Sequence, residues 1–147
     1  DDGEYDAIIL ACAGLIRLGF ESRIKHPLDV DTSLPAVGQG ALGIEIRKGD
    51  SEITKLIQGL IDQDTMTAVL AERAMNATLE GGCSVPIAGY ATIDGELLTL
   101  KGLVGNVSSG EILIEECIGS IDEPVSLGQL VANNLITKGA KNLLQEV

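Results

Sequence analysis

The sequence predicts two kinds of fold in one chain, a short α/β segment followed by an α+β domain. The α+β domain is predicted to be a three-stranded antiparallel sheet with helices on one face. Residues 7–13 are apolar at every position, which suits a strand buried on both faces of a parallel sheet. Beyond residue 64, one helical pattern, three strand patterns and a second helical pattern follow in turn. Asp94-Gly95, between the first two strand patterns, is a strong hairpin signal.

Short elements and loops are predicted for the part of the chain before residue 62. A helix over residues 13–20 follows the apolar run, and Gly19 is its predicted stop. Residues 21–33 are charged and contain proline, which indicates a loop or linker. Residues 50–61 then have the apolar spacing of a short amphipathic helix.

The polar stretch over residues 62–65 is predicted to separate two bodies, because it supplies residue types that cap helices. A helix from about residue 65 to 79 follows, and Gly81 is its predicted C′ residue. Its apolar stripe comprises Met66, Val69, Leu70, Ala74 and Ala77.

Three strands are predicted next, over residues 85–93, 97–104 and 111–118. Ser126 and Gln129 form a capping box that opens a helix, and Gly139 ends it before a last helical turn or two. The apolar stripe of this helix comprises Leu127, Leu130, Val131 and Leu135. The resulting order, α-β-β-β-α, predicts the helix-covered antiparallel sheet.

Composition and charge narrow the classes of function. The net charge of −12 argues against nucleic acid and anionic membranes as partners. Tyr5, Phe20 and Tyr90 are the only aromatic residues, so stacking on bases is not a main binding device. No apolar run is long enough to span a membrane, and the N-terminal residues do not resemble a signal peptide. The odd number of cysteines, without close spacing, indicates reduced thiols and a cytoplasmic protein.

A glycine-rich segment is the first candidate binding element. Gly38, Gly40 and Gly43 match the spacing of a dinucleotide-binding loop, but that motif needs a strand before it and a helix after it. Here a proline-containing loop precedes the glycines, and residues 42–46 alternate as a strand does. The segment is therefore either a loop that lets a ligand approach, with Gln39 as a hydrogen-bonding amide, or a turn between strands.

Arg17 is a second candidate, because it follows the C-terminal end of the predicted buried strand. Ligands of open α/β sheets bind at that end of the strands. The alternative is a charge on the solvated side of a short helix.

Cys83 is the third candidate, and it follows the Gly81-Gly82 pair. No further cysteine or histidine lies within local reach, which argues against a metal site. The predicted helix C-terminus before it disfavours a thiolate, which argues against a fast catalytic nucleophile. Two interpretations remain: a thiol alkylated once as an attachment point, beside space that the glycines clear, or an idle free thiol.

Five stretches resemble the porphobilinogen deaminase (hydroxymethylbilane synthase) family, in its order and at its spacing. They read DAIILA, AGLIRLG, LPAVGQGA, AERAMN and LEGGCSVPI, beginning at residues 6, 13, 34, 71 and 79. The similarity runs over essentially the whole chain. It corresponds to the C-terminal half of the family's chain.

The resemblance implies a cytoplasmic transferase of tetrapyrrole (haem) biosynthesis that links four porphobilinogen molecules into hydroxymethylbilane and releases ammonia. It also implies a dipyrromethane cofactor held by a thioether to Cys83, on which the oligopyrrole grows. Arg17 matches a substrate- and cofactor-binding arginine of the family, and Gln39 resembles a residue that contacts the cofactor. Ala13 and Gly14 match the cleft wall beside Arg17. Such arginines suit the acetate and propionate groups of the substrate.

The resemblance further implies three domains. Residues 1–35 would end domain 2, residues 36–61 would return to domain 1, and residues 62–147 would form domain 3. The first two segments would be the tail of a periplasmic-binding-protein-like α/β domain pair. Arg73 matches a family position too, and as a residue of the domain 3 helix it is expected to hold structure rather than substrate.

The family's catalytic aspartate lies in the N-terminal half, so no catalytic residue is expected here and this chain alone is predicted to be inactive. Its partners would be porphobilinogen, the growing oligopyrrole and the N-terminal half, in a monomeric complete enzyme.

Exposed apolar sheet edges favour self-association or disorder of residues 1–61. The cofactor would be absent from the fragment if its assembly needs the complete site. The alternative function is an inactive structural fragment or interaction module, in which Cys83 is idle.

Overall fold

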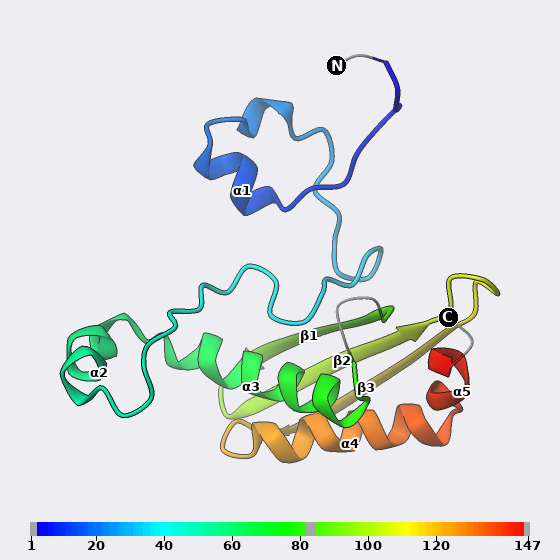
Figure 1. The fold of residues 1–147 in the computed structure, drawn as a ribbon. Coiled ribbons are helices and arrows are strands. Elements are labelled where there is room, and N and C mark those ends of the chain that lie inside the picture. The colour runs from blue at the N-terminus through cyan, green and yellow to red at the C-terminus, as the bar shows by residue number, and fades with distance from the viewer. Residues whose placement is uncertain (1–2, 82–84, 146–147) are drawn as a thin grey trace. The chain divides into compact units, whose positions relative to one another are not determined.

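The computed structural model describes residues 3–81 and 85–145. The chain divides into two units, the first ending at Ser33 and the second beginning at Leu34. Each unit is described by itself below, and Figure 1 gives the labels of the elements.

The first unit contains a short helix, α1 (Cys12–Arg17), and one 3-10 turn, η1 (Glu21–Arg23). The helix and its stop are as predicted. Gly19 has a φ of +74°, and the N–H groups of Gly19 and Phe20 donate to the carbonyls of Ile16 and Leu15 at 3.0 and 2.8 Å. These two bonds are the Schellman pattern that closes a helix on a glycine.

The predicted buried strand over residues 7–13 is wrong. Residues 7–11 have no regular secondary structure, Cys12 already begins α1, and Ile9 is 79% exposed. A strand needs a neighbouring strand to accept its backbone hydrogen bonds. The described residues of the first unit contain no strand that could pair with this run.

The second unit is an α+β domain, as predicted. Its helices are α2 (Ser51–Ile57), η2 (Gln58–Leu60), α3 (Gln63–Thr78), α4 (Pro124–Thr137) and α5 (Ala140–Gln145), and its strands are β1 (Ile87–Asp94), β2 (Leu97–Gly105) and β3 (Ile112–Ser120). The strand order is β1-β2-β3 with both pairings antiparallel, and Tyr90, Lys101 and Glu116 lie side by side across the sheet. Figure 1 shows α3 and α4 running along one face of this sheet.

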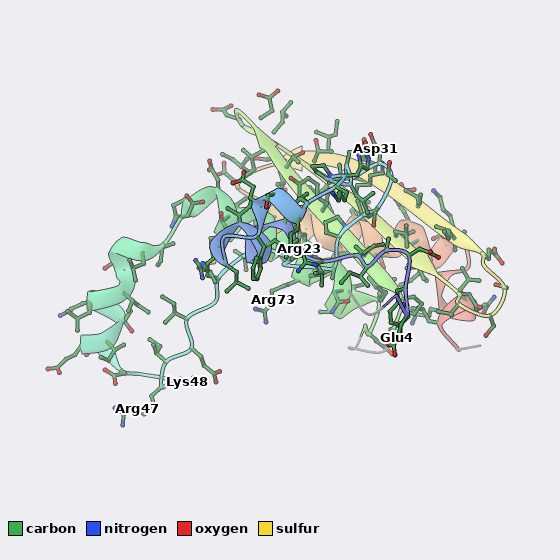
Figure 2. All side chains as sticks on the ribbon, turned by 90° about the horizontal axis from the view of Figure 1, so that it is seen from above. Glu4, Arg23, Asp31, Arg47, Lys48 and Arg73 are labelled. Atoms are coloured by element: carbon green, nitrogen blue, oxygen red, sulfur yellow. The ribbon has the colours of Figure 1, made fainter. Side chains whose placement is uncertain are left out.

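Local turn and capping signals place most of these elements. The two-residue loop between β1 and β2 is Gly95-Glu96, and Gly95 has a φ of +60°, which a glycine adopts without strain. The carboxylate of Asp62 caps α3 by accepting the N–H of Thr65 at 2.8 Å, and this bond lowers the pKa of Asp62. Asp50 caps α2 in the same way. Figure 2 shows Arg47 on the turn before α2, where it pairs with Asp50 at 3.3 Å.

Two local predictions in this unit are wrong. Residues 42–46 form no strand, and Leu42 is 80% exposed. The alternating pattern there has no neighbouring strand to pair with among the described residues. Ser126 and Gln129 form no capping box, because α4 already begins at Pro124 and no side chain caps it. Proline at the first helical turn loses no backbone hydrogen bond, which favours the earlier start.

The core lies between the sheet and the two long helices. Its largest fully buried side chains are Met75 from α3, Leu98, Leu100 and Val104 from β2, and Val131 and Leu135 from α4. The predicted stripe of α4 is confirmed except at Leu130, which is 48% exposed. The predicted stripe of α3 is largely wrong: Met66, Leu70 and Ala77 are exposed, and Ala71, Glu72 and Met75 are buried instead.

Close contact between α3 and α4 explains why Ala71 is buried and the larger Met66 and Leu70 are exposed. A Cβ added at Gly128 of α4 would collide with the carbonyl oxygen of Ala71 and lie 2.8 Å from both the Ala74 Cβ and the Met75 backbone nitrogen. Two helices approach this closely only where small residues face each other. The small side chain of Ala71 therefore lies at the contact, and the larger Met66 and Leu70 project elsewhere.

Asn106 ties the loop between β2 and β3 to the last helix. Its side-chain oxygen accepts the N–H groups of Ser108 and Ser109 at 2.9 and 2.8 Å, and its amide nitrogen donates to the Leu143 carbonyl at 3.0 Å. It is one of two buried polar or charged residues among those described; the other is Glu72.

No helix in the described part of the chain has the length and apolarity needed to cross a membrane. Within residues 3–81 and 85–145, no group of histidine, cysteine, aspartate and glutamate side chains is arranged to hold a metal ion.

Candidate functional site

The glycine loop, defined here as residues 35–41, packs against α3 and β1. The carbonyl of Pro35 accepts the N–H of Gly89 at 3.0 Å, and the N–H of Gly38 donates to the Glu72 carboxylate at 2.7 Å. Val37 packs against the hydrophobic core. The loop is therefore held by one apolar side chain and by backbone hydrogen bonds at two positions.

The backbone of the glycine loop turns sharply at its glycines. Gly38 and Gly40 have φ values of +73° and +88°, and a Cβ built at either would meet nothing within 4 Å. Glycine is thus required for its backbone angles rather than for space. Gln39 lies between them with an exposed side chain, whose oxygen accepts the N–H of Ala36 at 3.3 Å. A turn between two strands is excluded, because residues 42–46 form no strand, and the approach of a ligand to this loop stays a prediction.

A cavity of about 190 Å³ lies between the glycine loop, α3 and β1. It is lined by Pro35, Ala36, Gly38, Gln39, Gly40 and Ala41 of the loop, Thr65, Ala68, Val69 and Glu72 of α3, and Gly89, Tyr90 and Ala91 of β1. Cavities that enclose a whole small ligand are usually larger, roughly 300–1,000 Å³. This one has room for part of a ligand beside Gln39.

Glu72 is the buried charge at the base of this cavity. Its side chain is 5% exposed, and its two carboxylate oxygens accept the N–H of Gly38 at 2.7 Å and the N–H of Ala91 at 2.8 Å. The loss of surrounding water raises the pKa of Glu72, and the two backbone hydrogen bonds oppose that rise.

Ala13, Gly14 and Arg17 come together on α1, in the first unit. Arg17 occupies the last turn of the helix, and all three residues are exposed. A Cβ built at Gly14 would meet nothing within 4 Å, so a ligand can approach the backbone there. Ala13, Gly14 and Arg17 therefore form one candidate group on α1. Gln39 lies in the second unit and belongs to a separate candidate group.

Cys83 lies outside the described residues, and its role as an attachment point stays a prediction. The end of α3 just before it is described, and it corrects the predicted stop. Glu80, not Gly81, is the C′ residue: it has a φ of +58°, and the N–H groups of Glu80 and Gly81 donate to the carbonyls of Ala77 and Asn76 at 3.2 and 2.9 Å. An added Cβ at Gly81 would collide with the Asn76 side chain and lie 2.8 Å from Ile87 Cδ1, so these two side chains would have to shift.

Replacing Glu80 with glycine is expected to stabilise the second unit by roughly 0.5–1 kcal/mol, because a side chain at positive φ is strained. Chemical denaturation monitored by circular dichroism measures this change. Glu80→Ala is the matched control, since it removes the same charge from the helix C-terminus and keeps the strain. Equal stability of the two variants would contradict the prediction.

Two positioning contacts on α3 were missed by sequence reasoning. Glu72 holds the glycine loop, and Asn76 holds the turn before Cys83, where its side-chain amide also lies 3.5 Å from the Gly81 carbonyl. No local signal marked Glu72, because its buried neighbours on the helix, Ala71 and Met75, lay outside the predicted stripe. Arg73, expected to hold structure, is exposed on the same helix and extends outward in Figure 2.

Cys117 is a partly buried thiol on β3. Asn134 and Glu115 lie beside it at 3.6 and 3.7 Å, and Glu115 also pairs with Lys138. Burial and the Glu115 carboxylate raise the pKa of Cys117, which makes it a poor nucleophile.

Comparisons with known proteins cover nearly the whole chain. The family model described as porphobilinogen deaminase, C-terminal domain, matches residues 66–137, and the model described as porphobilinogen deaminase, dipyromethane cofactor binding domain, matches residues 1–55. The porphobilinogen deaminase of Vesicomyosocius okutanii subsp. Calyptogena okutanii (strain HA) is 58% identical over 146 residues, which are 99% of this chain and 48% of that protein. The porphobilinogen deaminase of Ruthia magnifica subsp. Calyptogena magnifica is 60% identical over 145 residues, again 99% of this chain and 48% of the relative. The chain therefore spans about half the length of the curated relatives it matches, and it belongs to the porphobilinogen deaminase family.

Proposed function

We propose that this chain is part of a porphobilinogen deaminase, a transferase that joins four porphobilinogen molecules into hydroxymethylbilane and releases ammonia. The observation that carries the proposal is the identity of 58–60% with named porphobilinogen deaminases over 99% of the chain. An interaction module with an idle thiol is not favoured, because both relatives are named as enzymes.

The cofactor in this proposal is a dipyrromethane attached through a thioether to Cys83, and it supplies the pyrrole to which the first porphobilinogen is joined. The described residues fit such a group in their chemistry. Its acidic side groups need cationic and amide donors, and Arg17 and Gln39 carry exposed donors of those two kinds. Open backbone at Gly14, Gly38 and Gly40 leaves space for a bulky ring system to approach. In the proposal, Ala13 and Gly14 form the wall beside Arg17.

The proposed domain assignment follows the family. Residues 1–35 end domain 2, residues 36–61 return to domain 1 as part of a periplasmic-binding-protein-like α/β pair, and residues 62–147 form domain 3. The end of the first unit at Ser33 supports the first boundary, whereas residues 34–147 form one unit, so the boundary at residue 62 rests on the family alone.

The proposed partners are porphobilinogen, the growing oligopyrrole and the remaining half of the same protein, which carries the catalytic aspartate. We propose a cytoplasmic, monomeric complete enzyme. The isolated chain is proposed to self-associate, because Tyr5, Ile8 and Ile9 of the first unit are each more than two-thirds exposed.

A reconstitution assay tests this function. Purified residues 1–147 alone are expected to show no consumption of porphobilinogen, since the proposed catalytic aspartate lies elsewhere. The same chain, co-expressed with the remaining half of the protein, is expected to release ammonia and form hydroxymethylbilane. Turnover of porphobilinogen by the isolated chain would contradict the proposal that the catalytic aspartate lies in the remaining half. The absence of turnover in the complete protein would overturn the function itself.

Intact mass reports the cofactor independently of turnover. An adduct on Cys83 in the complete protein supports the covalent dipyrromethane, and the isolated chain is expected to show its bare mass. A bare mass in the active complete protein would overturn the proposed attachment.

A further inference from the structure

We propose that Glu72 is a positioning residue that holds the glycine loop in the shape that presents Gln39 to the bound pyrroles. The identity of the ligand rests on the function proposed above. The contact between Glu72 and the glycine loop rests on the described geometry alone.

The two partners of the Glu72 carboxylate come from distant parts of the chain. Gly38 lies 34 residues before it and Ala91 lies 19 residues after it, and both donate backbone N–H groups at 2.7 and 2.8 Å. Each carboxylate oxygen therefore accepts one donor. From its position on α3, the Glu72 side chain therefore links the glycine loop to β1.

A carboxylate is the group that this arrangement requires. Both partners are donors, and a side-chain amide has one accepting oxygen and one donating nitrogen. Glutamine at position 72 has nearly the same shape, but it would turn its NH₂ group toward one of the two N–H groups. That N–H would be left buried without an acceptor, which corresponds to roughly a fivefold to 150-fold change in an equilibrium.

The same contact closes the free edge of β1. This strand lies at one edge of the sheet, and the N–H groups of Gly89 and Ala91 donate to Pro35 and Glu72 rather than to another strand. The glycine loop and Glu72 thus occupy the side of β1 where a further strand would pair. Of these two N–H groups, that of Gly89 holds the loop at Pro35, and that of Ala91 holds the Glu72 side chain that anchors Gly38.

Glu72 is the side-chain anchor of the loop. The N–H of Gly38 donates to its carboxylate at 2.7 Å, and the other polar contact with the body of the unit is the backbone bond from Gly89 to Pro35. Val37 contributes apolar contact on one side of Gly38. The bond from Gly38 to Glu72, together with the bond from the Gln39 N–H to the Ala36 carbonyl at 3.0 Å, therefore constrains the direction in which Gln39 leaves the surface.

The C-terminal end of α3 lies just beyond Glu72. One turn after Glu72, the carbonyl of Asn76 accepts the N–H of Gly81 at 2.9 Å, in the turn that leads to Cys83. Glu72 and Asn76 are four residues apart, so they lie on the same side of α3. A loss of the Glu72 contact would free the Gln39 loop and leave the turn before Cys83 in place.

The test compares Glu72→Gln with the unchanged complete protein. Hydrogen exchange of the Gly38 amide is expected to become at least about tenfold faster, because its acceptor is weakened or lost. The KM for porphobilinogen is expected to rise about tenfold, with a smaller change in kcat, since a contact that holds the ligand has moved. Asn106→Ala is the matched control: it removes another buried polar anchor, outside the glycine loop, and should lower stability without changing Gly38 exchange or KM.

A double-mutant cycle with Gln39→Ala separates positioning from general stability. If Glu72 acts through Gln39, Glu72→Gln raises KM in the unchanged protein but has little further effect in the Gln39→Ala protein. Equal effects in both backgrounds, or Gly38 exchange and KM unchanged by Glu72→Gln, would overturn the proposal. If Glu72→Gln does not fold, Glu72→Asp gives the same test, since its carboxylate is one methylene too short to reach both donors.

Failure of the proposed function would be seen separately. A complete protein without turnover contradicts the enzyme assignment, and in that case the Gly38 exchange still decides whether Glu72 anchors the loop. Faster Gly38 exchange with an unchanged KM in an active enzyme would overturn the role of the loop in presenting Gln39.

Discussion

Replacing Cys83 with serine in the complete protein is expected to remove the covalent adduct and to lower porphobilinogen turnover at least about a thousandfold. A serine hydroxyl is a far weaker nucleophile than a thiol, so the thioether has no counterpart in the variant. In the proposed function the tether holds the growing chain next to the reacting groups, so its loss would remove the advantage of an intramolecular reaction. Intact mass measures the adduct, and the release of ammonia measures turnover.

The other two cysteines are the matched controls for this prediction. Cys117→Ser is expected to keep both the adduct and the turnover, because that thiol is partly buried between α4 and β3 and its pKa is raised. Cys12→Ser is expected to behave in the same way. The attachment at Cys83 would be refuted by an adduct that persists in Cys83→Ser or disappears in either control.

Replacing Gly128 with alanine is expected to destabilise the second unit by roughly 2–4 kcal/mol, because overpacking at a close helix contact is costly. The added methyl group would collide with the Ala71 carbonyl oxygen and lie 2.8 Å from the Met75 backbone nitrogen. These are backbone atoms of α3, so relief requires the two helices to move apart and loosens the core around Met75. Glycine-to-alanine changes inside helices usually stabilise by up to about 1 kcal/mol, so the expected sign is the reverse of the ordinary one.

Urea unfolding monitored by circular dichroism measures the effect of Gly128→Ala. Gly59→Ala is the matched control, because a Cβ built at Gly59 meets nothing within 4 Å. That control is expected to change stability by less than about 0.5 kcal/mol, as surface substitutions do. A Gly128→Ala protein as stable as the control would show that α3 and α4 do not pack as closely as described.

The sheet of the second unit was predictable because its signals are local. Each strand alternates over a few residues, and a glycine with positive φ stands at the turn between the first two strands. The predicted strands at residues 7–13 and 42–46 rested on an uninterrupted apolar run and on alternation respectively, and neither strand forms. A pattern gives the faces of a strand but not its partner, and a strand without a partner leaves its backbone groups to water.

The buried face of α3 was mispredicted because hydrophobicity alone ranks large apolar residues first. Met66 and Leu70 are 44% and 41% exposed, whereas the small Ala71 is fully buried. The decisive residue is Gly128 on another helix, 57 positions away from Ala71 by their numbers. The same limit applies to the candidate site, since the contacts of Glu72 with Gly38 and Ala91 join residues far apart in the sequence.

The sequence by itself determined the α+β order of the second unit, the caps at Asp50 and Asp62 and the helix stops at Gly19 and Gly139, because each depends on atoms a few residues apart. It also determined the family, through motifs that keep their order. The tertiary structure alone decided which acid anchors the glycine loop and which residue carries the strain before Cys83. Glu72 meets Gly38 and Ala91 only once α3, β1 and the loop have packed together. Glu80 takes the positive φ because α3 ends at the buried Leu79, which makes the next residue the C′ position.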